Sequence, residues 1–263
     1  MTIYPHHQQT IERLTAHFQA DPAFLALLIG GSLVKGLGRP DSDVDFMLVA
    51  TPEEYARRVA ENAFQVFSLD FTDYEGGYVD GKVIDMDFLR DAADHGSEPA
   101  RFAFGQVIIA FSRDPQIDEL VARIPVYPEA GHAARIKSFY AQVQAHQWFV
   151  SEAEKRGEAY LMMHAASSLV LFGGRMILAH NRMLYPYHKW FMTMLRRAPQ
   201  QPENLMTLID ELLAQPSKAR ADAFCECLLS FTDWEIPGEG WPVRFMHDTE
   251  WTWRTGGAPL ADC

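Results

Sequence analysis

The clearest chemical signal in this sequence is a pair of aspartates inside an apolar stretch. Asp43 and Asp45 lie two residues apart in the run that ends at Val49, and side chains two apart on a β-strand point to the same face. Two ionised carboxylates a few ångströms apart repel each other unless a cation neutralises them. Because Mg²⁺ and Mn²⁺ prefer oxygen ligands, the pair predicts a divalent metal site.

A glycine-rich loop precedes this strand. Gly30, Gly31 and Ser32 follow the short apolar run from Phe24 to Ile29, which is typical of a buried strand. Glycines let backbone N–H groups approach a ligand closely, and such groups together with a hydroxyl suit phosphate oxygens. The loop and the aspartates together therefore predict a triphosphate bound with Mg²⁺.

Three better-known motifs do not fit the same residues. The spacing from Gly31 to Gly36 matches a Walker A loop, but Leu37 follows where that loop needs a lysine. A calcium loop beginning at Asp41 would need a glycine where Phe46 stands, and a dinucleotide fingerprint would need a glycine where Asp41 stands. A plain polar turn would explain the glycines but not two aspartates within a strand.

A second pair of aspartates lies further along the chain. A strand is predicted over 82–89, after a tight turn at Asp80-Gly81, and in it Asp85 and Asp87 share one face. If the apolar residues of both strands face helices, all four aspartates face the open side of the sheet. Asp85 or Asp87 would then join the first pair at the metal ions.

The glycine-serine loop followed by Asp43-x-Asp45 in an apolar strand resembles the signature of the DNA polymerase β-like nucleotidyltransferase superfamily, which includes antibiotic and minimal nucleotidyltransferases. In that superfamily a later strand supplies a third carboxylate, and the usual pattern favours Asp85 over Asp87 for it. The resemblance implies an NTP co-substrate, Mg²⁺ or Mn²⁺, and release of pyrophosphate. The residues that it implies are Asp43, Asp45 and Asp85 in catalysis, these three and Asp87 at the metal, and Gly30, Gly31, Ser32 and Lys189 at the nucleotide.

Beyond residue 125 the sequence turns helical. Helices are expected over 132–156, 159–180, 188–197, 203–214 and 218–231. The predicted fold class is α+β, with a small mixed sheet and flanking helices in residues 1–125 and an all-α bundle in residues 126–263 that ends in an irregular tail from Trp234. By resemblance, the first domain is catalytic and the second binds the substrate.

Two features of the helical half have candidate roles. Lys189 could reach the triphosphate, as a lysine does in several superfamily members, although an ordinary helix start explains its surroundings equally well. Arg175 and His180 match the loose Arg-x4–6-His pattern of nucleotide-binding helical domains, some of which cut RNA. Met176 replaces the asparagine usual in that pattern, so a structural role is favoured for the pair.

Composition narrows the partners. The net charge of −12 and the sequence pI near 5.2 disfavour nucleic acid, because phosphate backbones bind clustered Lys and Arg. Three cysteines without a Cys-x2-Cys pair indicate neither a disulfide framework nor a zinc site. With no apolar leader and no apolar run of membrane length, we expect a cytoplasmic protein without a membrane partner. The oligomeric state stays open, a homodimer being one arrangement, and His6 and His7 are interpreted as solvated.

The predicted function is transfer of an NMP from an NTP to a hydroxyl of a small molecule, such as an aminoglycoside-like or lincosamide-like acceptor. The alternative is a protein-AMPylating, antitoxin-like protein or an NTP-binding regulatory protein without small-molecule turnover. The partners expected are therefore an NTP and a small-molecule or protein acceptor. The sequence leaves open which NTP is used.

Overall fold

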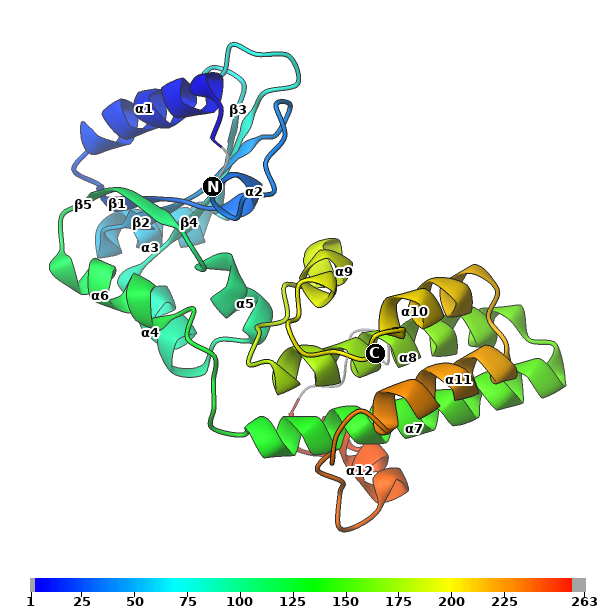
Figure 1. The fold of residues 1–263 in the computed structure, drawn as a ribbon. Helices are drawn as coiled ribbons and strands as arrows, with labels where there is room; N and C mark the ends of the chain where they lie inside the picture. Colours follow the sequence, from blue (N-terminus) through cyan, green and yellow to red (C-terminus); the bar gives the residue numbers. More distant parts are fainter. Residues whose placement is uncertain (1–2, 257–263) are drawn as a thin grey trace. The chain divides into compact units, whose positions relative to one another are not determined.

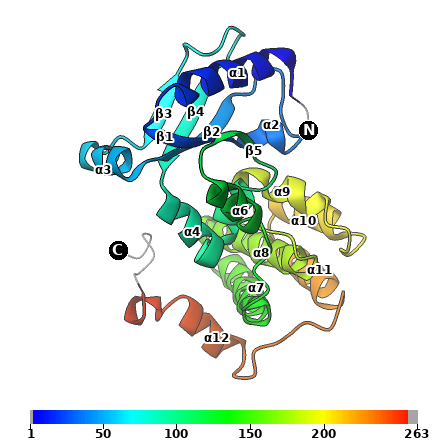
Figure 2. The same cartoon turned by 90° about the vertical axis from the view of Figure 1, so that its left-hand side faces the viewer.

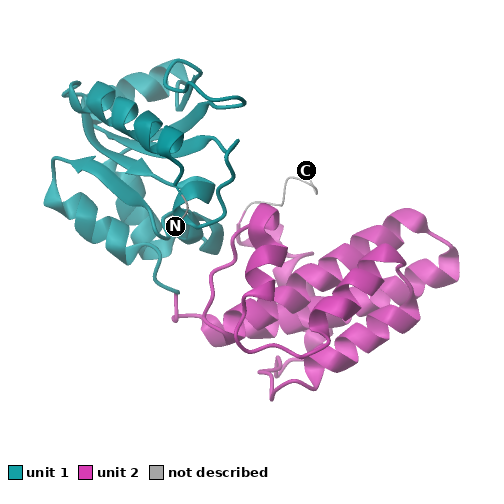
Figure 3. Cartoon of the chain, turned by 45° about the horizontal axis from the view of Figure 1, so that its top comes forward, with its two compact units in different colours: residues 1–127 teal, residues 128–263 magenta. Residues whose placement is uncertain are grey.

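The structure is a computed structural model that describes residues 3–256. The chain divides into two compact units, residues 1–127 and 128–263 (Figure 3). This division lies two residues after the boundary expected between 125 and 126, within a segment where Pro125 and Pro128 disfavour continuation of a helix. Each unit has its own apolar core.

Unit 1 is built on a five-stranded mixed sheet with the strand order β3-β4-β2-β1-β5. β1 pairs antiparallel with β2 and with β5, β4 pairs antiparallel with β3, and β2 and β4 run parallel. The strands are β1 (Phe24–Ile29), β2 (Val44–Ala50), β3 (Gln65–Ser68), β4 (Val79–Ile84) and β5 (Ile108–Ser112).

Helices cover the two faces of this sheet unequally (Figures 1 and 2). Val44, Phe46 and Leu48 of β2 face α1 and form one core with it. Val49 and Ile84 face the other side and pack with α4 and α6. The helices of unit 1 are α1 (Pro5–Gln19), α2 (Gly31–Val34), α3 (Pro52–Glu61), α4 (Met86–His95), α5 (Glu98–Ala103) and α6 (Pro115–Arg123).

Unit 2 is all-α, so the predicted class, a mixed sheet with flanking helices followed by a helical bundle, is confirmed. The tail predicted to be irregular from Trp234 is not wholly so, because Gly240 and Pro242 begin a further helix. The elements are α7 (His132–Arg156), α8 (Ala159–His180), α9 (His188–Arg196), α10 (Leu205–Ala214), α11 (Lys218–Leu229), α12 (Trp241–Asp248) and the 3₁₀ turn η1 (Thr252–Arg254).

α8 is 22 residues long and, by length and composition alone, apolar enough to cross a membrane. Its apolar residues have a second explanation in the packing of the bundle. A Cβ on Gly173 would lie 2.6 Å from the ring of Phe224, and a Cβ on Gly174 would lie 2.4 Å from the ring of Phe191. Because α9 and α11 pack this closely, the apolar composition of α8 matches the place of a core helix.

The core of unit 2 includes a buried histidine. His146 of α7 is 6% exposed, and its ring is stacked on Phe172 with 5.7 Å between centroids. Within the described residues its Nδ1 atom has no hydrogen-bond partner. Burial, with a smaller contribution from His164, lowers the pKa of His146 to about 4.

Acidification from pH 7 to pH 5 is expected to destabilise unit 2 through His146. The folded pKa lies below the unfolded value of 6.5, so the unfolded chain takes up a proton first as the pH falls. The stabilisation is present above pH 6.5 and is lost progressively down to about pH 4, and the loss at pH 5 is about 2 kcal/mol. Urea unfolding at both pH values should show a shallower pH dependence for His146→Gln than for the wild type or for His95→Gln, which alters an exposed histidine. Equal dependences in all three proteins would contradict this account.

Candidate functional site

The antiparallel pairing of β1 and β2 brings the glycine loop to the aspartate pair. Ile29, at the end of β1, pairs with Phe46 near the start of β2. The Gly30 N–H donates to the Asp45 carbonyl oxygen at 2.9 Å. Because the Gly30 N–H is used within the fold, the candidate backbone donors to a phosphate are Gly31 and Ser32. These two residues lie in the first turn of α2, and the first-turn N–H groups of a helix have no acceptor within that helix.

Gly31 leaves space that the Asp45 carboxylate occupies. Its φ angle is 68°, and a Cβ built on it would lie 1.8 Å from Oδ2 of Asp45. A real Cβ cannot take that position, so any other residue must displace either the loop or the carboxylate. The two halves of the sequence signature are therefore in direct contact.

Replacing Gly31 with alanine is expected to move the Asp45 carboxylate and to lower the free energy of unfolding by about 2 kcal/mol, because a left-handed φ and a steric clash are imposed together. Gly76→Ala is the matched control, since Gly76 has a φ of 74° and a Cβ added to it would meet nothing within 4 Å. Urea unfolding should show a larger loss for Gly31→Ala than for Gly76→Ala. Equal losses of unfolding free energy in the two variants would mean that the clash with Asp45 adds nothing to the destabilisation.

The register of β4 brings in a third carboxylate that the sequence interpretation missed. Asp80 pairs with Asp45 across the parallel strands β4 and β2, which places their backbones about 4.8 Å apart with side chains on the same face. Gln65 of β3 donates from Nε2 to Oδ1 of Asp80 at 3.0 Å. We call Asp43, Asp45 and Asp80 the carboxylate cluster.

The pKa of Tyr78 reflects the negative charge of the carboxylate cluster. The hydrogen bond that its hydroxyl makes with Asp43 raises the pKa of Tyr78, and the charges of all three carboxylates of the cluster add to the effect. One phenol therefore lies within electrostatic reach of all three carboxylates. Such a concentration of negative charge at one end of a sheet favours a bound cation.

Asp85 and Asp87 do not lie on a strand. β4 ends at Ile84, and Asp85 caps α4 by accepting a hydrogen bond from the Phe88 N–H at 2.8 Å. Asp87 lies in the first turn of α4, is 79% exposed and pairs with Arg90 at 2.6 Å.

The strand predicted over 82–89 therefore holds only as far as Ile84, and the placement of Asp85 and Asp87 beside the first aspartate pair is wrong. The register pairs Val49 with Ile84, so Asp85 lies at the opposite end of β4 from Asp80, about 16 Å away along the strand. The Asp80-Gly81 pair is typical of a tight turn, but it lies inside β4. A glycine is needed at position 81 because the ring of Phe46 fills the space of a side chain there: a Cβ on Gly81 would lie 2.2 Å from that ring.

Aromatic residues from other segments hold the loop that leads to Asp43. The Ser42 carbonyl oxygen accepts hydrogen bonds from Nε2 of His7 at 3.0 Å and from the Tyr74 hydroxyl at 2.8 Å. His6 contacts the Pro40 carbonyl oxygen at 2.9 Å. His7 is fully buried, and burial lowers its pKa. The interpretation as solvated is wrong for His7, because α1 begins at Pro5 and its first turn packs on this loop, whereas His6 is only half-buried.

Lys35, at the end of α2, forms hydrogen bonds with the backbone of the turn between α5 and β5. Its Nζ donates to the carbonyl oxygens of Gly105 at 2.6 Å and Ala103 at 3.3 Å. Burial lowers the pKa of Lys35 to about 8, and the charge of Asp45 opposes that shift. A lysine at this position adds positive charge near the glycine loop, a feature that the sequence interpretation did not use.

The donor set suits Mg²⁺ together with a phosphate ligand. Within residues 3–256, no three His, Cys, Asp or Glu side chains form a ready-made metal site. Mg²⁺ commonly takes one or two protein carboxylates and completes its shell of oxygen ligands with substrate phosphates and water. Asp43 and Asp45 fit that requirement, so the cluster is suited to a metal that arrives with a nucleotide.

The candidate residues of unit 2 have local partners. Lys189 lies in the first turn of α9 with its Nζ 5.2 Å from the centroid of the Trp190 ring, and its contact with a nucleotide stays a prediction. The Arg175 guanidinium lies 4.3 Å from the centroid of the ring of Phe139, a core residue of unit 2. His180 contacts Gln200 at 2.9 Å. Residues five apart on a helix lie about 140° apart around its axis, so Arg175 and His180 do not share a face.

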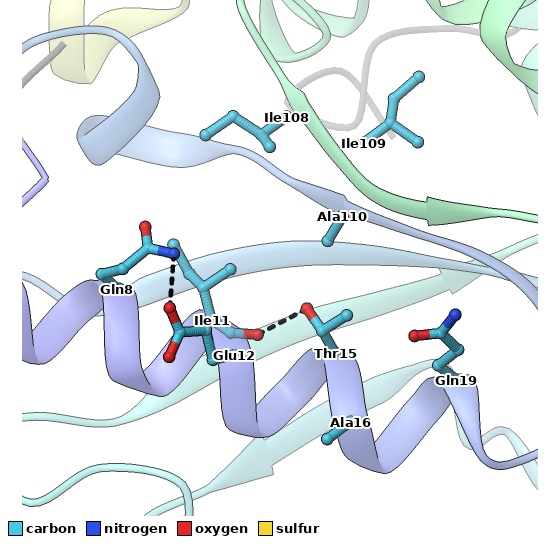
Figure 4. A pocket seen from close by; sticks show the side chains of 9 residues that line it. All are labelled: Gln8, Ile11, Glu12, Thr15, Ala16, Gln19, Ile108, Ile109 and Ala110. Carbon is cyan, nitrogen blue, oxygen red and sulfur yellow. Dashed lines mark hydrogen bonds between the residues drawn. The ribbon is translucent and has the colours of Figure 1, made fainter.

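A pocket of about 460 Å³ lies between α1 and β5 (Figure 4). On its α1 wall, Gln8 donates to Glu12 at 3.0 Å and Thr15 donates to the Ile11 carbonyl oxygen at 2.7 Å. Its lining residues are Gln8, Ile11, Glu12, Thr15, Ala16, Gln19, Ile108, Ile109 and Ala110. None of the predicted site residues is among them, so this pocket is separate from the carboxylate cluster and the adjoining glycine loop.

No protein-family model matches the chain, and no curated protein sequence matches it. Among solved structures, the chain is similar to the crystal structure of a nucleotidyltransferase-like protein from Exiguobacterium sibiricum 255-15, with 11% sequence identity and a TM-score of 0.48, over 85% of this chain and 73% of that one.

Proposed function

We propose that this protein is a Mg²⁺-dependent nucleotidyltransferase, which transfers an NMP from an NTP to a hydroxyl group and releases pyrophosphate. The observation that carries the proposal is the contact between the two parts of the signature. Gly31 and Ser32 lie at the end of the sheet where Asp45 and Asp80 are neighbours. A loop suited to phosphate oxygens and carboxylates suited to Mg²⁺ thus adjoin each other.

Each residue of the site has a distinct role in this reaction. Asp43 and Asp45 would hold Mg²⁺, which would supply charge neutralisation and alignment of the phosphates. The Ser32 hydroxyl and the N–H groups of Gly31 and Ser32 bind the β- and γ-phosphates. Asp80 accepts the proton of the attacking hydroxyl, the role that the sequence interpretation gave to Asp85.

The strand order supports an in-line displacement. The glycine loop follows β1 on one side of Asp45, and Asp80 on β4 lies on the other side. The acceptor oxygen forms its bond to the α-phosphorus from the Asp80 side, and the bond between that phosphorus and the bridging oxygen to the β-phosphate breaks. Pyrophosphate then leaves on the side of the glycine loop, and the proton passes to Asp80.

The same proposal extends to the acceptor, to the role of unit 2 and to the cellular compartment. The net charge of −12 and the carboxylate cluster favour a positively charged small molecule, such as an aminoglycoside-like or lincosamide-like acceptor, over an anionic one. Unit 2 is proposed to bind the substrate, with Lys189 contacting the triphosphate. Because its proposed donor is an NTP, we propose that the protein acts in the cytoplasm.

The test uses NTPs that carry ³²P either at the α- or at the γ-phosphate, with Mg²⁺, a panel of aminoglycosides and lincosamides, and cell extract. The proposal predicts that the α-label passes to an acceptor and the γ-label appears as pyrophosphate. Transfer of the γ-label would indicate a kinase instead, and absence of any transfer by the wild type would remove the basis of the proposal. An α-labelled protein band would identify a protein as the acceptor.

A further inference from the structure

We propose that Phe67 and Tyr78 form the surface on which the acceptor binds, and that this acceptor is a cyclic alcohol that carries a positive charge. The proposal rests on the proposed function, since it names the substrate class of the same site. It adds two aromatic side chains that the sequence signature does not contain.

The register places both side chains on the face of the carboxylate cluster. Phe67 of β3 is directly opposite Asp80 of β4, and residues directly opposite each other in an antiparallel pair point to the same face. Its neighbour Val66 packs on the α1 core, which is the other face. Tyr78 precedes Asp80 by two residues, and its ring centroid is 5.5 Å from that of Phe67.

Phe67 is exposed to an unusual degree for an aromatic residue of a sheet. Its relative exposure is 59%, in a strand that forms the edge of the sheet. Edge strands more often carry charged residues or proline, which discourage association. An exposed aromatic face whose cross-strand neighbour is the carboxylate Asp80 is instead suited to a ligand that covers it.

The position of Phe67 fits the acceptor side of the reaction. Two strand spacings separate β3 from β2, so the backbone of Phe67 lies about 10 Å from that of Asp45. The glycine loop lies on the opposite side of Asp45, following β1. A ring resting on Phe67 would therefore direct a hydroxyl substituent toward Asp80 while the triphosphate occupies the far side.

The chemistry of the surface selects the class of acceptor. Aromatic faces bind the C–H face of a ring and attract cations. The Tyr78 ring lies 5.5 Å from the Phe67 ring, centroid to centroid, so the two rings together form the aromatic part of this surface. The carboxylates themselves give it a negative potential, which favours an ammonium group on the ring over a neutral or acidic substituent.

The test measures binding without nucleotide in the full-length protein, by saturation-transfer NMR with aromatic irradiation. The probes are trans-4-aminocyclohexanol and its neutral counterpart 1,4-cyclohexanediol. The wild type should transfer saturation to the ring protons of the amine and bind the diol several-fold more weakly. Phe67→Ala should weaken binding of the amine about tenfold, and Phe67→Trp should restore it. Leu69→Ala is the matched control, because Leu69 is a nearby apolar residue with 61% exposure, and it should change the affinity less than about twofold.

Equal binding of the amine to the wild type and Phe67→Ala would overturn the proposal, as would equal affinities of the wild type for the two probes. An α-labelled protein acceptor whose labelling is unaffected by Phe67→Ala would overturn it as well. These outcomes are separate from the proposed function, because binding of Mg²⁺ and nucleotide by Phe67→Ala should equal that of the wild type. Absence of nucleotide binding in the wild type itself would instead contradict the proposed function.

Discussion

Replacement of Asp45 with asparagine is expected to lower the rate of NMP transfer by about 1,000-fold or more, since an interaction worth several kcal/mol in the transition state is removed. Asparagine keeps the size of the side chain beside Gly31 but removes the charge that we propose to hold Mg²⁺. The fold should persist, because the Gly30 N–H bonds to the backbone carbonyl of residue 45 and not to its side chain.

The measurement for this variant is the rate of α-label transfer, together with thermal unfolding to show that the protein is folded. Asp87→Asn is the control, because Asp87 also carries a carboxylate but lies exposed on α4. The control should transfer within about twofold of the wild type. Transfer that survives Asp45→Asn in a folded protein would remove Asp45 from the site.

Replacement of Asp80 with asparagine is expected to lower transfer about 100-fold to 10,000-fold, the range usual for loss of a general base. The same change at Asp85 should leave both transfer and stability near the wild-type values, because asparagine caps a helix as well as aspartate does. The contrast follows from the register, which pairs Asp80 with Asp45 and leaves Asp85 as the cap of α4.

The two variants are assayed side by side for transfer, with thermal unfolding to show that both are folded. If Asp80 is the base, transfer should be lost in Asp80→Asn and kept in Asp85→Asn. The reverse result, with transfer lost only in Asp85→Asn, would contradict the assignment drawn from the register. It would restore the interpretation made from the sequence.

The elements that the sequence predicts best are those fixed by local signals. Thr51 accepts a hydrogen bond from the Glu54 N–H and Pro52 begins α3, as a cap followed by proline predicts. The bounds of α7 and α8 agree with those expected, since a left-handed Gly157 separates the two helices. In each case the deciding residues are neighbours in the sequence.

The elements that the sequence predicts poorly depend on distant contacts. Asp80-Gly81 is typical of a turn, yet the ring of Phe46 needs the space above Gly81, and β4 continues through it. The sequence predicts a solvent-exposed His7 side chain, yet the loop ending at Ser42 buries it. Because register and burial of this kind are set across strands, the third carboxylate was found only from the pairing of β2 with β4.

The most direct test of the central claim is equilibrium binding of nucleotide, because it needs no knowledge of the acceptor. Calorimetric titration with the α,β-methylene analogues of the four NTPs, with and without Mg²⁺, would compare the wild type with Asp45→Asn and Asp85→Asn. We predict that at least one analogue binds only with Mg²⁺, that Asp45→Asn weakens this binding about tenfold, and that Asp85→Asn leaves it unchanged. Binding that is independent of Mg²⁺, or that is lost in Asp85→Asn and kept in Asp45→Asn, would contradict a metal site built on Asp43 and Asp45.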